Sequence, residues 1–519
     1  MIMKRTSYAL ILFFFLFSAC SKQTEVTRYL PRGVPEAEGV SSEGIIQFLD
    51  SAAKSRNEFH SIMVLRHGKV VAEGWWNPYR ADLKHTLYST SKSFTSTAVG
   101  FAVTEKKLSL SDKVVSFFPN DLPDTVSANL ASLTVRDLLM MSAGQDPEPT
   151  GQVVSKDSNW VKGFLAAPIV HKPGSVFLYN SLASYMLSAI VQKVTGEKVI
   201  DYLTPRLFKP LYIEGIDWET DPRGINTGGW GLRLKTEDMA KFGQLLLQKG
   251  KWNGKQVIPS AWVEEATTFK IDQAPGAPQS KKDSSDWMQG YCYQFWRCRH
   301  NAFRADGAFG QYIIVMPDKD AVVAITAETP DMQDEINLVW KYILPALKDM
   351  KLPANEAKDD ELKQRLLSLA LPVPPKGAAS PLAEKISGKT YLLSANDRHI
   401  NAITFTPGQD SCKLTLKTDT AAFDLHFASG QWQPGETTLH GPNLVAGAIN
   451  NQNGLPPFKT DGAYYWQDQQ TLVFVLRYIE SPHTLTLSCK FDKNKVSIDF
   501  KNSFAFRMKT IPVEGNLAR

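Results

Sequence analysis

A proline-rich segment divides the chain into two parts whose secondary-structure signals differ. Residues 350–385 are first charged and then rich in proline, which predicts a linker. Before it, residues 34–349 alternate helix-like and strand-like stretches. After it, residues 386–510 carry almost only short strand signals, separated by glycine, asparagine and aspartate turns. The pattern predicts a mixed domain of helices and strands, followed by a small all-β accessory domain without a catalytic cluster.

Local signals in the first domain predict individual elements. Residues 43–54 have the spacing of an amphipathic helix, and residues 332–347 predict the last helix of the domain. Thr134 with Asp137 is typical of a capping box at a helix start. Residues 312–325 predict a hairpin of two apolar strands around a Pro-Asp-Lys-Asp turn.

Charge and motif content exclude several functions. The 519 residues include 58 Lys and Arg against 53 Asp and Glu, interspersed along the chain, for a net charge of +5. No basic run resembles a nucleic-acid patch, so we expect no nucleic-acid partner. The C-x₂-C and His-Glu-x-x-His spacings of zinc sites are absent, and the nine histidines are scattered. We therefore expect no metal and no cofactor.

The N-terminus has the pattern of an export signal. Lys4 and Arg5 precede an apolar run over residues 9–17, which is too short for a membrane span. The following Ser18-Ala19-Cys20 resembles a bacterial lipobox, although Phe17 replaces the usual leucine. We interpret residues 1–19 as the signal peptide of a lipoprotein, lipidated on Cys20. The protein would then be exported and anchored to a membrane of the bacterial cell envelope. The alternative is an ordinary cleaved signal with an incidental cysteine.

Four further cysteines permit two disulfides in an exported chain. Cys292 and Cys298 flank an aromatic run, and Cys412 and Cys489 both lie in the C-terminal third. These are the two expected pairs if disulfides form.

One tetrapeptide carries the chemistry expected of a nucleophilic enzyme. Ser89-Thr90-Ser91-Lys92 is an S-x-x-K, and at the start of a helix its first and last side chains lie on one face. A neighbouring amine can take the serine proton only if burial lowers its pKa. The apolar and small residues over 93–102 predict such burial. The motif alone is weak, because Ser51-Ala52-Ala53-Lys54 also matches it on a predicted surface helix.

Further segments along the chain make the S-x-x-K match at Ser89 more specific. Residues 172–181 contain Pro-Gly-Ser-Val-Phe-Leu-Tyr, which ends at Tyr179. Three further segments, residues 133–139, 228–232 and 306–311, occur along the chain in the order that the family shows. Together they resemble the serine hydrolase superfamily of class C β-lactamases, D,D-peptidases, related esterases and 6-aminohexanoate-dimer hydrolases. The resemblance spans roughly residues 35–348. It implies an α+β fold, with an antiparallel sheet flanked by helices, a helical subdomain and a site between them.

The resemblance also implies the roles of individual residues. Ser89 would attack a carbonyl and form an acyl-enzyme, and Lys92 and Tyr179 would share the proton transfers. The backbone N–H groups of Ser89 and of Ala308, after Gly307, would form the oxyanion hole.

Two departures from the family pattern bear on the substrate. Ser181 stands where the tyrosine motif usually ends in asparagine, as in the aminohexanoate-dimer hydrolase branch. The third motif, usually Lys-Thr-Gly or His-x-Gly, reads Ala305-Asp306-Gly307, which would not attract a carboxylate. We therefore expect a small-molecule or peptide-like ester or amide without that charge, and hypothesise that a substrate amine faces Asp306. The alternatives are a β-lactamase or D,D-peptidase, and a catalytically silent binding or scaffold protein with this fold.

Overall fold

The computed structural model describes residues 28–377, 380–445, 454–505 and 511–519. The signal segment and Cys20 lie outside the described residues, so lipidation stays a prediction. No helix within the described ranges has the length and apolar character needed to cross a membrane.

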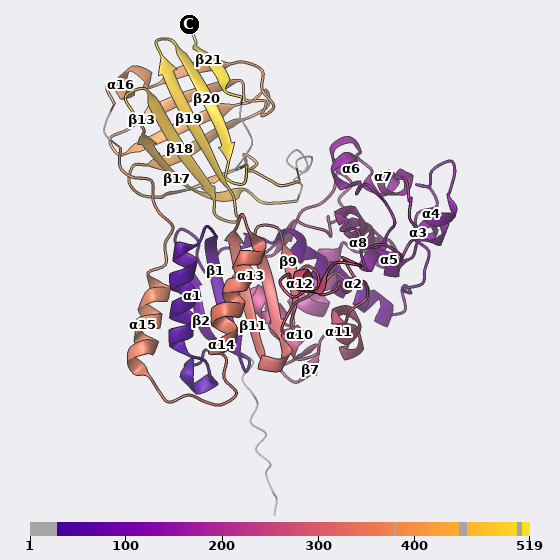
Figure 1. Ribbon diagram of the computed structural model, residues 1–519. Helices are drawn as coiled ribbons and strands as arrows, with labels where there is room; N and C mark the ends of the chain where they lie inside the picture. The colour runs from indigo at the N-terminus through magenta and orange to yellow at the C-terminus, as the bar shows by residue number, and fades with distance from the viewer. Residues whose placement is uncertain (1–27, 378–379, 446–453, 506–510) are drawn as a thin grey trace, which may run out of the picture.

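A six-stranded sheet forms the centre of the first domain, and all its neighbouring strands run antiparallel (Figure 1). Its strands, in spatial order, are β2 (Lys69–Trp75), β1 (Glu58–Arg66), β11 (Ala321–Glu328), β10 (Gln311–Met316), β9 (Phe303–Gly307) and β8 (Trp296–Arg297). The predicted hairpin is confirmed, because β10 and β11 pair from Tyr312↔Ile325 to Met316↔Ala321.

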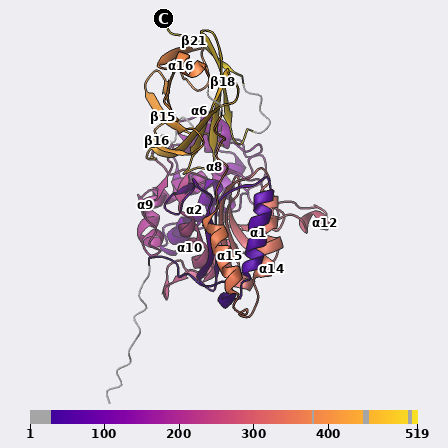
Figure 2. The same cartoon turned by 90° about the vertical axis from the view of Figure 1, so that its left-hand side faces the viewer.

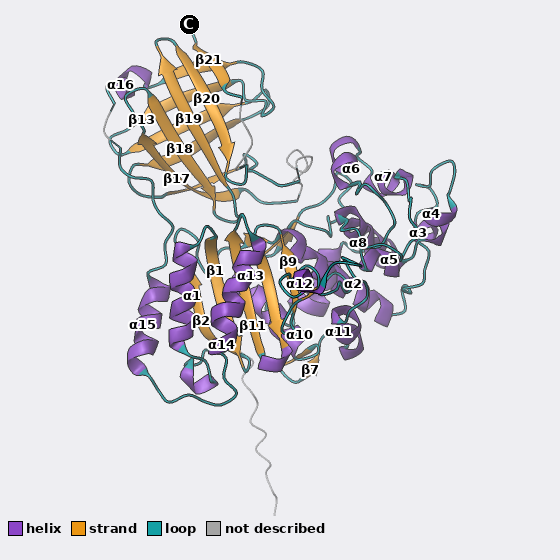
Figure 3. Cartoon of the chain, in the orientation of Figure 1, coloured by secondary structure: helices purple, strands orange, loops and turns teal. Residues whose placement is uncertain are grey.

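Helices cover both faces of this sheet, since its strands are apolar on both sides. One face carries α1 (Ser42–Lys54) and a last helical stretch made of α13 (Met332–Leu338), a π-helical turn over Val339–Ile343 and α14 (Leu344–Ala346). The opposite face carries α10 (Thr236–Leu247), which contacts β1, β10 and β11. Figure 3 shows this layered arrangement.

A helical subdomain lies beside the sheet, and α2 (Ser91–Thr104) joins the two, with every residue from 91 to 102 buried. The subdomain contains α3 (Val114–Phe117), α4 (Ala128–Ser132), α5 (Val135–Leu139), α6 (Thr150–Lys156), α7 (Trp160–Ala166), α8 (Ser181–Thr195) and α9 (Val199–Leu203). The predicted capping box at the start of α5 is confirmed.

Small elements complete the first domain. They are β3 (His85–Thr86), the 3₁₀ turn η2 (Tyr88–Thr90), a π-helical turn over Thr204–Phe208, β4 (Asp217–Trp218), β5 (Leu232–Leu234), β6 (Lys251–Trp252), β7 (Lys255–Gln256), α11 (Ser260–Thr267) and α12 (Gln279–Lys282), with 3₁₀ turns at Glu36–Glu38 and Pro317–Lys319.

The C-terminal domain is a ten-stranded sheet that closes on itself through a contact between β15 and β17. In spatial order its strands are β15 (Ala422–Ala428), β14 (Ser411–Lys417), β13 (Ala402–Pro407), β12 (Lys389–Leu393), β21 (Val513–Leu517), β20 (Lys495–Asn502), β19 (Thr484–Asp492), β18 (Thr471–Tyr478), β17 (Phe458–Trp466) and β16 (Gln433–Thr437), preceded by α16 (Leu382–Ile386). Both views place this sheet over one end of the first domain (Figure 1 and Figure 2). The predicted fold class, an α+β domain followed by an all-β domain, is confirmed.

The domain edges differ from the sequence interpretation. The segment interpreted as a linker contains α15 (Glu356–Leu367), which packs on α1 and β2. Its composition is strongly charged, so the few leucines that contact the first domain gave no clear apolar stripe. The last strand, β21, lies beyond the expected end at residue 510.

The structure forms neither expected disulfide, since the four described cysteines are buried free thiols. Cys292 packs in the apolar core on one side of the central sheet and Cys298 in the core on the other side. Cys412 and Cys489 share one core but lie on β14 and β19, which are not neighbours in the closed sheet.

The packing of α15 generates a prediction about stability. Leu362 is 2% exposed against the first domain, whereas Leu367 on the same helix is 81% exposed. Leu362→Ala should lower the free energy of unfolding by about 2–5 kcal/mol, because it leaves a cavity. Leu367→Ala should leave it within about 0.5 kcal/mol. Urea unfolding of both variants measures these changes. If Leu362→Ala changes the free energy of unfolding as little as Leu367→Ala, residues 356–367 act as a linker.

Candidate active site

The S-x-x-K motif lies where η2 continues into α2, as its spacing predicts. Ser89 is half-buried in η2, and Lys92, in the first turn of α2, is 1% exposed. The Lys92 Nζ and Ser89 Oγ atoms lie 2.9 Å apart in a hydrogen bond. The second S-x-x-K match, in α1, stays at the surface of the domain: Ser51 is only partly buried and Lys54 is exposed. Burial therefore distinguishes the two matches.

Lys92 also contacts two groups from distant parts of the chain. Its Nζ lies 2.7 Å from the carbonyl oxygen of Gly229 and 3.0 Å from Ser181 Oγ. A carbonyl can only accept, so a neutral Lys92 amine donates to Gly229 and to one hydroxyl. Its lone pair is then free to accept the proton of the other hydroxyl.

Burial lowers the pKa of Lys92 to about 7, although the carboxylates of Glu148 and Asp306 act to raise it. A lysine with that pKa is largely neutral just above neutral pH. It can therefore serve as a general base, which an exposed lysine with its ordinary pKa cannot.

Tyr179 and Ser181 reach the site from the start of α8. Asn180 caps this helix, with its side chain accepting from the Ala183 N–H at 2.9 Å. Asn180 is thus engaged in capping, and Ser181 presents its hydroxyl to Lys92 instead. The Tyr179 ring lies against Trp296, with centroids 5.6 Å apart, and 4.8 Å from Lys92 Nζ. Removal from bulk water raises the pKa of Tyr179, and a hydrogen bond with Ser89 partly offsets that rise.

The strand β9 brings Gly307 and Ala308 alongside η2. A Cβ on Gly307 would lie 2.2 Å from the carbonyl oxygen of Leu87, so only glycine allows this approach. Two side-chain hydrogen bonds connect these segments. Thr90 donates to the carbonyl of Gln311 at 2.8 Å, and Gln311 Nε2 donates to the carbonyl of Ala308 at 3.1 Å. The peptide after Gly307 is therefore held next to the turn that carries Ser89.

Asp306 has a partner that the sequence reasoning missed. The Arg304 Nε donates to its Oδ2 at 2.8 Å, and the two side chains alternate with the apolar ones along β9. Burial raises the pKa of the Asp306 carboxyl, and Arg304 partly offsets that rise. Arg304 is fully buried, with its guanidinium carbon 4.4 Å from the Trp287 ring centre. The buried guanidinium therefore pairs with Asp306 and not with solvent. This ion pair weakens the attraction of the Asp306 carboxylate for a substrate amine.

Glu148 is a second residue that sequence reasoning missed. Its Oε1 accepts from the Ser181 N–H at 3.2 Å, at the N-terminus of α8. A carboxylate is stabilised there by the free N–H groups and the helix dipole. No motif singles out this glutamate, and its position near Lys92 follows only from the packing of the loop over residues 144–149.

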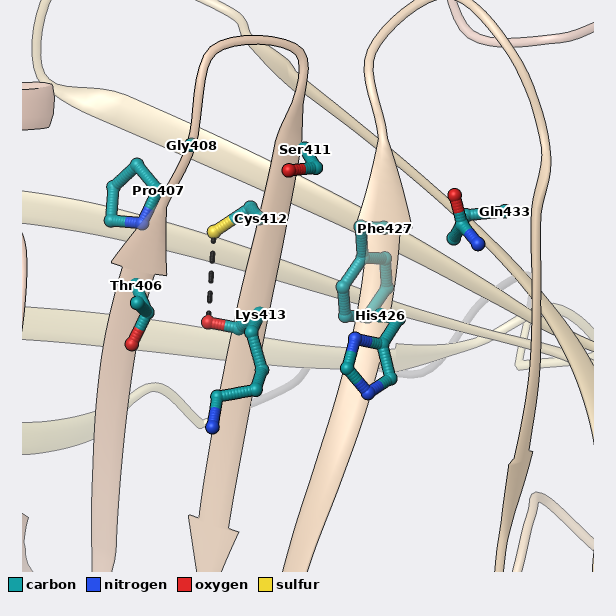
Figure 4. A pocket seen from close by; sticks show the side chains of 9 residues that line it. All are labelled: Thr406, Pro407, Gly408, Ser411, Cys412, Lys413, His426, Phe427 and Gln433. Atoms are coloured by element: carbon teal, nitrogen blue, oxygen red, sulfur yellow. Dashed lines mark hydrogen bonds between the residues drawn. The ribbon is translucent and has the colours of Figure 1, made fainter.

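Hollows elsewhere in the described residues offer no comparable chemistry. One lies on the C-terminal domain and is lined by Thr406, Pro407, Gly408, Ser411, Cys412, Lys413, His426, Phe427 and Gln433 (Figure 4). Burial raises the pKa of the Cys412 thiol to about 12, so it is not a thiolate at neutral pH. Another lies between the domains and is lined by Asp82, Lys84, Glu214, Gly215, Lys235, Glu436, Pro456, Pro457, Lys459 and Glu480.

Comparison with known proteins points to one family. The sequence model of the β-lactamase family matches residues 56–347. The 6-aminohexanoate-dimer hydrolase of Paenarthrobacter ureafaciens is 25% identical over 292 residues, which cover 52% of this chain and 73% of that protein.

Solved structures agree with the observed fold. A candidate 6-aminohexanoate-dimer hydrolase from Bacillus anthracis superposes with a TM-score of 0.51 at 24% identity, covering 63% of this chain and 89% of that one. A candidate β-lactamase from Bacteroides dorei superposes with a TM-score of 0.50 at 18% identity, covering 59% and 99%. At these low sequence identities, the two superpositions show that the first domain shares the fold of these proteins.

Proposed function

Because the chain belongs to the β-lactamase family, we propose that it is a serine hydrolase that cleaves an ester or amide through an acyl-enzyme on Ser89. The observation that carries the proposal is the 2.9 Å contact between Ser89 Oγ and the buried amine of Lys92. A serine hydroxyl is a weak nucleophile until a base takes its proton, and the short contact together with the lowered pKa of Lys92 supports this amine as the base.

The proposed reaction has two halves. Ser89 Oγ attacks the substrate carbonyl while its proton passes to Lys92 or Tyr179, and the N–H groups of Ser89 and Ala308 stabilise the oxyanion. Collapse of the intermediate breaks the ester or amide bond, and the leaving alcohol or amine takes up the proton. Water then attacks the acyl-enzyme and gives up a proton to the same base. The base returns this proton to Ser89 Oγ as the acyl bond breaks and the acid leaves.

The substrate class follows from what surrounds the nucleophile. Trp296, against Tyr179, contributes an aromatic surface, and the Ala-Asp-Gly motif of β9 offers no free cation for a substrate carboxylate. We favour an uncharged or amine-bearing ester or amide. The Paenarthrobacter relative is named for a dimer of 6-aminohexanoate, a compound with an amine at one end. A β-lactamase or D,D-peptidase is the second candidate, favoured by the family match itself.

The proposed location rests on the sequence of the N-terminus. Lipidation of Cys20 after cleavage of residues 1–19 would anchor the enzyme to a membrane of the cell envelope and let it act on small substrates there.

Covalent labelling tests the proposed nucleophile. A fluorophosphonate should add to the wild-type protein with a stoichiometry of about one, measured by intact mass, and should not add to Ser89→Ala. Ser51→Ala is the matched control, since it removes the serine of the surface S-x-x-K, and it should label like wild type. An unlabelled but folded wild-type protein would favour the silent scaffold.

The low pKa of Lys92 predicts the pH dependence. The pKa of this lysine is lowered to about 7, so the base form is lost below that pH and is complete above it. For a neutral ester, kcat/KM should rise about tenfold per pH unit below the pKa and level off above about pH 7. Thermal unfolding over the same range controls for loss of the fold. A profile that stays flat down to about pH 5.5 would exclude Lys92 as the base.

The charge beside the site predicts the substrate preference. If Asp306 faces a substrate amine, Asp306→Asn should lower kcat/KM for an amine-bearing ester relative to its acetylated analogue by about tenfold. Penicillin and neutral p-nitrophenyl esters, compared on the wild type, separate the β-lactamase alternative from the esterase. An unchanged preference in Asp306→Asn would mean that the ion pair with Arg304 leaves this carboxylate without a role in recognition.

A further inference from the structure

One turn of the C-terminal domain docks directly behind the nucleophile. Residues 479–483, which join β18 to β19, contact the first domain through several hydrogen bonds. The carbonyl of Glu480 accepts from the Thr86 N–H at 2.9 Å, and the carbonyl of Ser481 accepts from the Tyr79 hydroxyl at 3.0 Å. On β18, Arg477 pairs with Glu58 through two contacts of 2.6 and 3.0 Å. The all-β domain is thus docked at the segment that leads to Ser89.

The last residue of this turn, His483, is fully buried between the domains. Its Nδ1 lies 2.7 Å from Glu328 Oε1 at the end of β11, and its Nε2 lies 2.5 Å from the hydroxyl of Tyr88. The carboxylate requires a donor, so Nδ1 carries the proton in the neutral ring and Nε2 accepts from Tyr88. Ser503 Oγ also donates to Glu328, at 2.6 Å, which fixes that carboxylate.

His483 also packs against the turn that follows β9. Its ring lies edge-on to Phe309, with centroids 4.8 Å apart, and Phe309 contacts the Tyr88 ring at 5.5 Å. Phe504 of the C-terminal domain contacts both rings, with centroids 4.5 Å from His483 and 5.5 Å from Phe309.

Tyr88 and Phe309 are the chain neighbours of the two residues proposed to form the oxyanion hole. Tyr88 directly precedes Ser89 and Phe309 directly follows Ala308, so each is bonded to a residue whose N–H belongs to the proposed oxyanion hole. Both have a left-handed backbone, with φ of 46° for Tyr88 and 66° for Phe309. Large side chains rarely adopt this conformation, and it persists only where surrounding contacts impose it.

We propose that His483 is a positioning residue for the oxyanion hole: by holding Tyr88 and Phe309 together, it sets the relative placement of the Ser89 and Ala308 N–H groups. This rests on the proposed function and extends it by giving the C-terminal domain a part in catalysis. The donor nitrogens of an oxyanion hole lie about 2.7–3.1 Å from the developing oxyanion, and small displacements from that geometry cost large factors in rate.

Kinetics of three variants test the proposal. His483→Ala and Tyr88→Phe should each lower kcat for a neutral ester about 10- to 100-fold while KM stays within about threefold, because the hole acts mainly in the transition state. The affinity for a boronic acid, which forms a tetrahedral adduct on serine, should fall by the same factor as kcat. His483→Gln, which keeps an acceptor for the Tyr88 hydroxyl, should restore part of the rate.

Two controls separate positioning from docking and folding. Tyr79→Phe removes an interdomain hydrogen bond to the same turn without touching the oxyanion residues, and His426→Ala removes an exposed histidine of the same domain. Both should keep the wild-type kcat. If Tyr79→Phe lowers kcat as much as Tyr88→Phe, or if neither Tyr88→Phe nor His483→Gln changes kcat or boronate affinity, the proposal is wrong. Tyr88→Phe and His483→Gln remain decisive if His483→Ala does not fold.

Fluorophosphonate labelling of the wild type distinguishes the two proposals. A wild-type protein that does not label at Ser89 would contradict the hydrolase function itself. A labelled wild type whose Tyr88→Phe variant reacts at the same rate would contradict only the role of His483.

Discussion

Burial of the Lys92 amine is the constraint on which the first domain depends. An amine removed from water needs hydrogen-bond partners or loses its charge more readily. Lys92 has three such partners, and burial lowers its pKa to about 7. Its three neighbours come from η2, from the start of α8 and from the loop before β5, at positions 89, 181 and 229. These segments must converge for the lysine to be buried at all. The fold and the lowered pKa are therefore two results of the same packing.

The central helix shows how composition serves this packing. Residues 91–102 of α2 are all buried, and many of them are serine, threonine, alanine or glycine. Small side chains let neighbouring elements approach, as where Trp262 lies so close to Gly100 that a Cβ there would overlap its indole. Two of their hydroxyls donate to carbonyl groups of neighbouring elements: Ser93 donates to Gln294, and Thr95 donates to Gly228. A polar helix can thus be buried because its hydroxyls bond to the backbone of the elements around it.

The two domains meet at the back of the site rather than at a remote surface. The 479–483 turn contacts the segment before Ser89, and His483 contacts the turn after Ala308. The family match ends at residue 347, so the C-terminal domain lies outside the region that the comparison covers. Two side chains outside its strands, His483 and Phe504, contact residues of the first domain that have left-handed backbones. An accessory domain placed in this way can influence catalysis without supplying a group that touches the substrate.

The sequence by itself determined what depends on neighbours along the chain. The S-x-x-K places two side chains on one helical face, and the Thr134–Asp137 capping box and the β10–β11 hairpin are likewise local. Tertiary structure alone decided which distant groups surround the site: Glu148 near Lys92, Arg304 on Asp306 and His483 on Tyr88. Nor could the sequence tell α15 from a linker, because its helix is stabilised by a few leucines that contact the first domain. The physical reason is that backbone geometry fixes side-chain spacing only over a few residues. Burial, which sets charge and pKa, depends on the whole fold.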